Sequence, residues 1–192
     1  GKSIIKFKPK NINLLTPNRL EMNLGDEEKC RKFISIEKPD WIINSGAFTH
    51  VDNAELSKFR EEVFKINFKS VKTFCKLLNK YEGKLMQIST DYVFDGNSKK
   101  PYETYEETKP NNVYGKSKAL AEKYIKNSLK GMNQYIILRT SWLVSPYGRN
   151  FVLTIMKLLK EKDSINVVND QIGEMTSANN LANLCWKLIE AN

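Results

Sequence analysis

Three residues between positions 87 and 118 have side chains whose types and spacing could support acid–base chemistry on a carbonyl group. Thr90 follows a short apolar run, residues 84–88, of the kind that forms a buried strand. Tyr114 and Lys118 are four residues apart in a segment with helical character, so their side chains would share one helical face. A hydroxyl at a strand end, with a phenol and an ammonium on the next helix, can donate a proton to a ketone during its reduction. Taken alone, a Tyr/Lys pair at this spacing is more often an ordinary surface pair.

Buried strands that end in polar loops would position these side chains. Apolar runs at residues 41–43, 84–88 and 135–138 predict strands, and the loops that follow them cover residues 45–51, 89–95 and 139–142. Ligands of parallel α/β sheets bind beyond the carboxyl ends of the strands. We therefore expect the three loops to converge on one site.

The remaining segments complete an α/β pattern. Runs at residues 3–7, 11–15 and 165–168 are also compatible with strands, and helices are expected at about residues 26–37, 55–83, 114–129, 151–162 and 177–191. Asp26 is the expected N-cap of the first of these helices. Alternating strands and helices predict a Rossmann-like parallel sheet with helices on both faces, in a single domain over residues 1–192.

Composition argues against several classes of function. The net charge is +9, but the lysines alternate with acidic residues along predicted helices, which favours a solvated surface and no nucleic-acid partner. No apolar run reaches membrane-spanning length and the N-terminus lacks the features of a signal peptide, so we expect a cytoplasmic protein without a membrane partner. Cys30, Cys75 and Cys185 fall in predicted helices without metal-ligand spacing, which predicts buried reduced thiols and no metal site.

Five motifs resemble those of one enzyme family. They are INSGAFTHVDNAE (residues 43–55), STDYVFDG (89–96), YGKSK (114–118), LRTSW (138–142) and NDQIGEMTSANNLA (169–182). They are similar to the dTDP-4-dehydrorhamnose reductases, which belong to the extended short-chain dehydrogenases/reductases, and the resemblance runs from about Glu21 onward. It implies reduction of the 4-keto group of dTDP-4-dehydro-L-rhamnose to dTDP-L-rhamnose by hydride from NADPH or NADH. The implied partner is a dTDP-sugar substrate, and the resemblance allows a homodimer.

The resemblance also implies roles for individual residues. Tyr114 would donate the proton, Lys118 would favour the phenolate and hold the nicotinamide ribose, and Thr90 would hydrogen-bond the carbonyl oxygen. The implied cofactor-binding residues are Asn23, Leu24, Ser45, Gly46, Ala47, Tyr114 and Lys118, with the nicotinamide against residues 45–47 and the adenine near Asn23, where the family usually has aspartate. The implied substrate-binding residues are Thr49, Val51, Thr90, Asp91, Tyr92 and Trp142.

Several of these positions also have a purely structural interpretation. Arg139 could form an ion pair at a strand end, and Trp142 could be a buried core aromatic. Asp52 and Glu55 are better explained as helix-capping and loop-ordering residues. Asn67 matches a helical asparagine that serves a proton relay in the superfamily.

The sequence departs from the family in two respects. It contains no Gly-rich GxxGxxG turn after a first strand, and the segment that completes the sugar-nucleotide pocket is missing after Asn192, so we expect a chain that is incomplete at both ends. Two other functions therefore stay open. One is a non-catalytic nucleotide-binding regulatory subunit of the methionine adenosyltransferase beta type, and the other is a related sugar-nucleotide epimerase or dehydratase.

Overall fold

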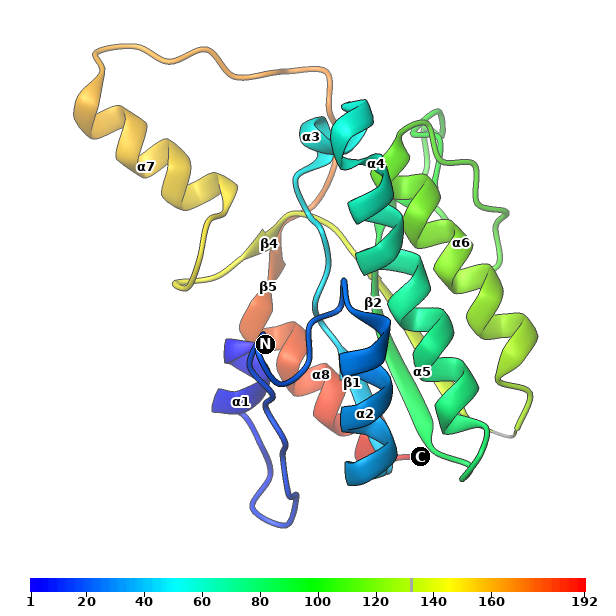
Figure 1. Ribbon diagram of the computed structural model, residues 1–192. Coiled ribbons are helices and arrows are strands. Elements are labelled where there is room, and N and C mark those ends of the chain that lie inside the picture. The colour runs from blue at the N-terminus through cyan, green and yellow to red at the C-terminus, as the bar shows by residue number, and fades with distance from the viewer. Residues whose placement is uncertain (132) are drawn as a thin grey trace. The chain divides into compact units, whose positions relative to one another are not determined.

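The computed structural model describes residues 1–131 and 133–192, and its chain divides into two compact units (Figure 1). The central unit comprises Leu15–Arg139, and the terminal unit comprises Gly1–Leu14 and Thr140–Asn192. A single domain over the whole chain stays a prediction.

A three-stranded sheet forms the centre of the central unit. Its strands are β1 (Trp41–Asn44), β2 (Lys84–Thr90) and β3 (Tyr135–Thr140), in the order β1-β2-β3. β1 and β2 run parallel with Trp41 beside Lys84 and Asn44 beside Gln87. The predicted parallel α/β architecture is confirmed, and each of the three expected apolar runs forms a strand.

Helices cover this sheet, and two of them pack directly on β2. The helical segments are α2 (Glu27–Glu37), α3 (Val51–Glu55), α4 (Ser57–Phe64), η1 (Lys65–Lys69, a π-helix), α5 (Ser70–Leu78), η2 (Asp91–Val93, a 3₁₀ turn) and α6 (Val113–Ser128). α5 and α6 contact β2 and each other, and α2 packs against α5 (Figure 1). Apolar residues of these elements form one core that includes Cys30, Ile34, Phe74, Leu78, Leu85 and Ile125. Burial of such one-sided apolar stripes is the main force that holds helices on a sheet.

The N-terminus of α2 agrees with the sequence. The Asp26 carboxylate accepts hydrogen bonds from the backbone N–H groups of Glu28 and Lys29, both at 3.1 Å. These groups have no carbonyl partner within the helix, so the aspartate satisfies them as an N-cap.

The long helix expected at residues 55–83 runs from Ser57 to Leu78 as α4, η1 and α5 in direct succession, and the short helix α3 precedes it where a loop was expected. Leu56 has extended backbone angles and separates α3 from α4. The π-helical turn η1 then carries Asn67, whose side chain accepts a hydrogen bond from the Phe48 N–H at 2.8 Å and donates to the Phe48 carbonyl at 3.1 Å. The Asn67 amide also donates to the Ser117 hydroxyl at 2.9 Å. A π-helical turn widens the helix locally, and here it presents one buried amide to the loop after β1 and to α6.

The terminal unit is mainly helical. Its elements are α1 (Lys2–Lys6), β4 (Leu143–Val144), α7 (Phe151–Glu161), β5 (Thr176–Ser177) and α8 (Ala178–Glu190), with β4 parallel to β5. α1 packs on α8, where the Ser3 hydroxyl donates to the Asn179 amide oxygen at 3.0 Å and the Trp186 indole N–H donates to the Ile4 carbonyl at 3.0 Å.

Three expected strands are wrong. Residues 3–7 belong to α1 and the turn after it, and residues 11–15 and 165–168 form no strand. The side chains in these runs have strand propensity, but a strand also needs a neighbour for its backbone hydrogen bonds. In α1 the hydrogen bonds from Ile5 N–H to Gly1 and from Phe7 N–H to Ser3 satisfy the backbone locally instead.

The three cysteines are free and buried, as predicted. Cys30 lies in α2, Cys75 in α5 and Cys185 in α8. Burial raises the pKa of the Cys30 thiol to about 11 and that of Cys75 to about 12, so both stay protonated at neutral pH. In the described part of the chain, no group of three or more His, Cys, Asp or Glu residues could hold a metal ion. None of the described helices is both long and apolar enough to cross a membrane.

The first turn of α6 is fixed by two side chains and a close backbone contact. The Asn112 side chain accepts from the Gly115 N–H at 2.7 Å, and the Glu55 carboxylate accepts from the Val113 N–H at 2.6 Å. A Cβ at Gly115 would lie only 2.1 Å from the Tyr92 carbonyl oxygen. Glycine is required here because it lets the helix reach the backbone that follows β2.

We expect Gly115→Ala to destabilise the protein, because neither the helix nor the Tyr92 backbone can move aside without losing these contacts. The free energy of unfolding should fall by about 2 kcal/mol or more, outweighing the gain in helix propensity from alanine. Urea unfolding measures this directly. Lys116→Ala changes the exposed neighbour on the same helix and should alter stability by less than about 0.5 kcal/mol. Equal stability of the two variants would contradict the close contact.

Candidate active site

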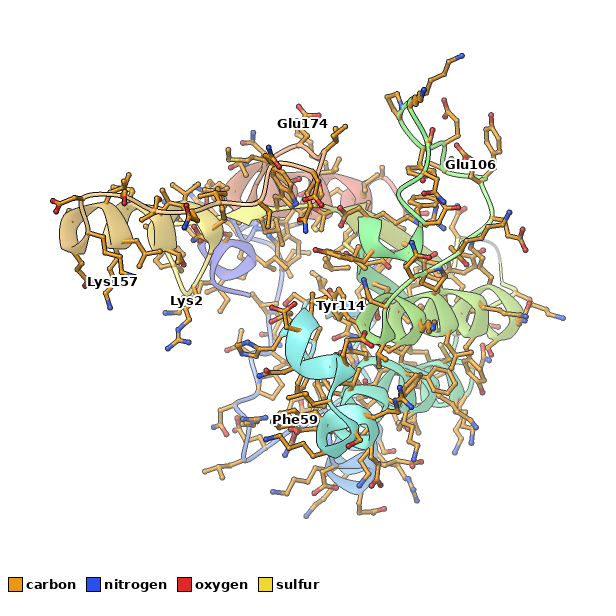
Figure 2. The ribbon with its side chains drawn as sticks, turned by 90° about the horizontal axis from the view of Figure 1, so that it is seen from above. Lys2, Phe59, Glu106, Tyr114, Lys157 and Glu174 are labelled. Atoms are coloured by element: carbon orange, nitrogen blue, oxygen red, sulfur yellow. The ribbon has the colours of Figure 1, made fainter. Side chains whose placement is uncertain are left out.

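The structure brings Thr90, Tyr114 and Lys118 together at the carboxyl end of β2. Thr90 is the last residue of β2 and is buried, and its side chain hydrogen-bonds the Tyr114 phenol. Tyr114 is the second residue of α6, where it is labelled in Figure 2. One turn later, the Lys118 ammonium donates to the Ile88 carbonyl of β2 at 2.7 Å. The spacing seen in the sequence therefore corresponds to a real cluster.

Burial dominates the ionisation of Tyr114. It raises the pKa of the phenol to about 12, the Thr90 hydrogen bond opposes this, and nearby Asp91 adds to it. Desolvation outweighs the other influences on the ring, so the pKa of Tyr114 lies above its usual value, and the expected effect of Lys118 on the phenolate stays a prediction. The phenol is therefore protonated at neutral pH, which is the state that a proton donor needs.

Lys118 is a buried lysine whose ammonium has a lowered pKa. Only 2% of the residue is exposed, and desolvation lowers the pKa of its ammonium to about 8, with the Glu122 carboxylate acting in the opposite direction. A lysine that titrates this close to neutrality on a helix beside a protonated phenol is typical of a functional site rather than of a surface ion pair.

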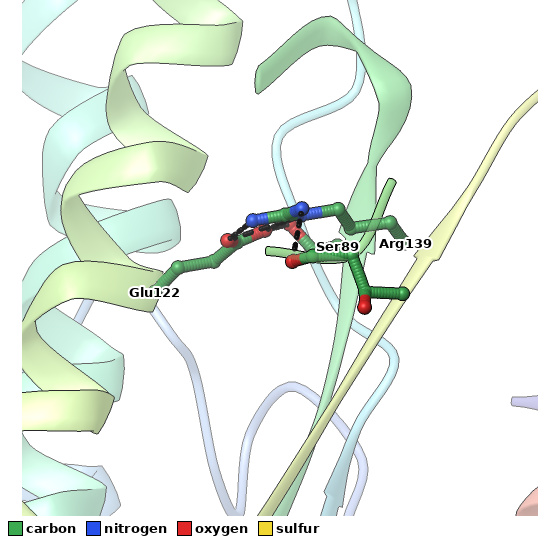
Figure 3. A network of polar contacts seen from close by, with 4 residues as sticks. Ser89, Glu122 and Arg139 are labelled. Atoms are coloured by element: carbon green, nitrogen blue, oxygen red, sulfur yellow. Dashed lines mark hydrogen bonds and ion pairs between the residues drawn. The ribbon is translucent and has the colours of Figure 1, made fainter. Parts of the chain in front are cut away.

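A buried carboxylate lies one turn beyond Lys118 and connects three elements (Figure 3). Glu122 of α6 accepts a hydrogen bond from the Ser89 hydroxyl of β2 at 2.5 Å. Its other partner is the Arg139 guanidinium of β3, whose Nη2 lies 2.7 Å from Glu122 Oε2. The side chains are 16% and 2% exposed for Arg139 and Glu122, so this pair is far more buried than the chain's helical surface pairs. The strand-end ion pair considered for Arg139 is confirmed.

Arg139 also anchors the loop between η2 and α6. Its guanidinium carbon lies 4.8 Å from the centroid of the Phe94 ring, and its Nη1 donates to the Thr104 carbonyl at 3.2 Å. Phe94 in turn stacks on Tyr102, with centroids 4.2 Å apart and rings nearly parallel. The Tyr102 hydroxyl donates to Asp95 at 2.7 Å. Glu106, on the outer part of the same loop, is labelled in Figure 2.

Asp91 and Tyr92 border the phenol. Asp91 accepts a hydrogen bond from the Thr90 hydroxyl at 3.0 Å, and its pKa is raised by burial. The rings of Tyr92 and Tyr114 meet edge to face, with centroids 6.0 Å apart. Asp52, in the first turn of α3, raises the pKa of Tyr92 less strongly than burial and Asp91 do. Tyr92 thus contacts the Tyr114 ring, and Asp91 acts on the phenol through its charge.

The residues expected to bind a cofactor form two segments of the central unit. Gly46 follows Asn44, the last residue of β1, and a Cβ on it would lie 2.6 Å from Leu24 Cδ1, so residues 45–47 and Leu24 are in contact. The Asn23 side chain accepts from the Gly25 N–H at 3.0 Å, which folds this segment into a tight turn. The glycine of this loop therefore provides close packing against Leu24.

Thr49 and Val51 occupy the loop after β1 and the start of α3 in the central unit. Trp142 belongs to the terminal unit, where it has a positive φ of 38°, lies with its ring tilted against Phe151 at a centroid distance of 6.5 Å, and contacts Gly173. It is 36% exposed, so the interpretation as a buried core aromatic is wrong.

Two residues with clear roles at this site, Glu122 and Gly115, were not recognised from sequence. Glu122 is four residues after Lys118, so its place on the same helical face could have been read from the spacing. Gly115 gave no such signal, because its role depends on the distance to another element. Glu55 was correctly assigned to capping and loop order, although its partner, the N–H of Val113, is 58 positions away in the chain. Asn67 orders the Phe48 backbone, and its match to a proton relay stays a prediction.

The fold and the site define a Rossmann-like α/β protein with a partly buried tyrosine and a buried lysine at a strand end. The family model described as the RmlD substrate binding domain matches residues 2–192, and the chain belongs to this family. A dTDP-4-dehydrorhamnose reductase of Aggregatibacter actinomycetemcomitans is 34% identical over 192 residues, which are 99% of this chain and 64% of that protein. The chain thus spans less than two thirds of this relative's length.

Solved structures show the same relationship. The crystal structure of a dTDP-4-dehydrorhamnose reductase from Clostridium acetobutylicum superposes with a TM-score of 0.91 and 34% identity, covering 100% of this chain and 66% of that one. The reductase from Bacillus anthracis, solved in complex with NADP, gives a TM-score of 0.90 and 33% identity over 98% of this chain and 66% of that one.

We expect Lys118→Met to stabilise the protein at neutral pH. The folded chain lowers the pKa of Lys118 from 10.5 to about 8, so folding disfavours the charged form. A shift of that size corresponds to about 3 kcal/mol, from which about 1 kcal/mol is lost with the hydrogen bond to Ile88. The net gain of about 2 kcal/mol should be complete below about pH 8.

The stability gained by Lys118→Met depends on pH. Between about pH 8 and 10.5 the unfolded wild-type chain binds more protons than the folded one, so wild-type stability rises with pH and the advantage of Lys118→Met disappears. Urea unfolding at neutral and alkaline pH measures both values. Lys123→Met, at an exposed position of α6, should show no comparable pH-dependent gain. A pH-independent difference for Lys118→Met would rule out a buried titrating ammonium.

Proposed function

We propose that this protein is an NAD(P)H-dependent reductase that converts dTDP-4-dehydro-L-rhamnose to dTDP-L-rhamnose. The observation that carries the proposal is the cluster of Thr90, Tyr114 and Lys118, in which a protonated phenol and a buried ammonium share one face of α6 beside a strand end. The reductases to which the chain is similar by sequence and by structure support the same reaction.

The residues present fit a nicotinamide cofactor. An ammonium has three N–H donors, and the Ile88 carbonyl accepts one of them, so Lys118 suits the adjacent hydroxyls of a ribose. Residues 45–47 carry only small side chains directly after β1, at the end of a sheet where such folds bind nucleotides. Asn23 and Leu24 would lie near the adenine, although the amide oxygen of Asn23 already accepts from Gly25. The NADP in the Bacillus anthracis reductase supports the assignment of the cofactor class.

Reduction of a ketone adds a hydride to carbon and a proton to oxygen. When bound, the reduced nicotinamide supplies the hydride. Tyr114 holds the proton in a phenol whose pKa of about 12 keeps it in place until the carbonyl oxygen becomes basic. The Thr90 hydroxyl hydrogen-bonds the same oxygen, and Lys118 offers a cation one helical turn away that stabilises the phenolate left behind.

Residues around this cluster would hold the sugar nucleotide. Asp91 and Tyr92 lie against Tyr114 and would contact the keto sugar. Thr49 and Val51 of the central unit would contribute further contacts, and a substrate contact by Trp142 stays a prediction. Arg139 has a structural role through Glu122 and is not assigned to the substrate.

Tyr114→Phe provides the direct test. The variant keeps the ring and its packing but removes the donated proton, so turnover should fall by a factor of about 10² to 10⁴ while NADPH binding changes little. The loss of nicotinamide absorbance with dTDP-4-dehydro-L-rhamnose measures turnover, and cofactor fluorescence measures binding.

Tyr105→Phe is the matched control, because Tyr105 is 84% exposed on the loop before α6. It should leave both quantities unchanged. Full activity of Tyr114→Phe would refute the proposed role, and tight NADPH binding by a wild-type protein that reduces no keto-sugar nucleotide would favour a regulatory subunit instead.

A further inference from the structure

The buried carboxylate of Glu122 is a second charged centre beside the candidate catalytic cluster. The residue is 2% exposed, and the proposed reduction gives it no part in transferring the hydride or the proton. Isolated buried carboxylates are costly, so a protein retains one only where its partners compensate for the lost hydration. Glu122 has two such partners, the Ser89 hydroxyl and the Arg139 guanidinium.

The position of these partners relates Glu122 to the site. Ser89 lies between Ile88, whose carbonyl accepts from Lys118, and Thr90, which hydrogen-bonds Tyr114. The bond from Ser89 to Glu122 therefore ties the middle of this three-residue strand end to α6. Lys118 and Glu122 are one turn apart on the same helix, and the charge of the carboxylate raises the pKa of the ammonium against the effect of burial.

Other groups around Lys118 do not substitute for this carboxylate. β2 contributes the Ile88 carbonyl and the Ser89 hydroxyl, which carry no charge. η2 contributes Asp91 and Tyr92, which influence Tyr114. β3 contributes Arg139, a second cation that is compensated by Glu122 itself. η1 approaches α6 through the neutral amide of Asn67.

We propose that Glu122 is a positioning residue that keeps Lys118 charged and holds the Ile88–Thr90 strand end against α6. Without the carboxylate, Lys118 would sit in a desolvated place beside an uncompensated Arg139, and its proton would be lost at lower pH. Arg139 acts through Glu122, because its three hydrogen bonds to the carboxylate fix the direction in which that group points. The role assigned to Lys118 rests on the proposed function, whereas the effect of Glu122 on the charge of Lys118 does not.

The test follows the protonation of Lys118 without any substrate or cofactor. Protein labelled with ¹³C at the lysine ε-carbons is titrated by NMR, and the Lys118 signal is identified by its disappearance in Lys118→Arg. In the wild-type chain the midpoint should be near pH 8. In Glu122→Gln, which keeps an acceptor for Ser89 but removes the charge, the midpoint should fall by about one pH unit.

Two further variants keep the test decisive. Glu61→Gln removes the carboxylate of an exposed pair with Lys65 at the same i,i+4 spacing and should leave the Lys118 midpoint unchanged. Glu122→Gln combined with Arg139→Gln removes both buried charges, so it should fold even where the single variant does not, and Lys118 should still titrate below its wild-type midpoint.

The outcomes separate this proposal from the proposed function. A lower midpoint in the Glu122 variants, with thermal stability of the double variant near that of the wild type, supports a positioning role. An unchanged Lys118 midpoint in folded Glu122 variants overturns it and reduces Glu122 to a structural ion pair. If the midpoint moves but no keto-sugar nucleotide is reduced, the proposed function fails while the linkage between Glu122 and Lys118 stands.

Discussion

The close approach of α6 to the end of β2 is the constraint on which the site depends. Gly115 allows the helix to lie against the Tyr92 carbonyl, a distance that any side chain at this position would prevent. Once the helix is this close, three side chains on successive turns of α6 hydrogen-bond the strand end. Tyr114 bonds Thr90, Lys118 bonds the Ile88 carbonyl and Glu122 bonds Ser89. The contact between Gly115 and the Tyr92 carbonyl thus sets how far three polar side chains of α6 lie from the strand end.

Burial has opposite consequences for the two titrating groups of this cluster. It raises the pKa of Tyr114 and lowers that of Lys118, because in both cases the neutral form is the one that tolerates a desolvated position. The ordinary pKa values of the two groups, 10.0 and 10.5, therefore become about 12 for the phenol and about 8 for the ammonium.

Sequence patterns recovered those features that are local in the chain. The three strands of the central unit follow from uninterrupted apolar runs, the N-cap of α2 follows from Asp26, and the pairing of Tyr114 with Lys118 follows from helical periodicity. Features that depend on distant partners were not recoverable. Residues 3–7 and 165–168 have suitable side chains for strands but no strand beside them.

The site shows the same division between local and distant information. The π-helical turn of the long helix carries Asn67, whose side chain accepts a hydrogen bond from the Phe48 N–H, 19 positions away in the chain. The raised pKa of Tyr114 depends on how completely the ring is covered, which no spacing of residues reveals. The types of the reacting groups could thus be read from the sequence, whereas their ionisation and their support could not.

The distribution of the buried thiols has a practical consequence. Cys30 and Cys75 lie in the core of the central unit, and Cys185 lies in α8 of the terminal unit. A thiol in such a place reacts with an alkylating reagent only when the structure around it opens, so its labelling rate reports a local opening equilibrium. The chain therefore carries natural probes in both units, and mass spectrometry of alkylated peptides can follow the opening of each unit separately.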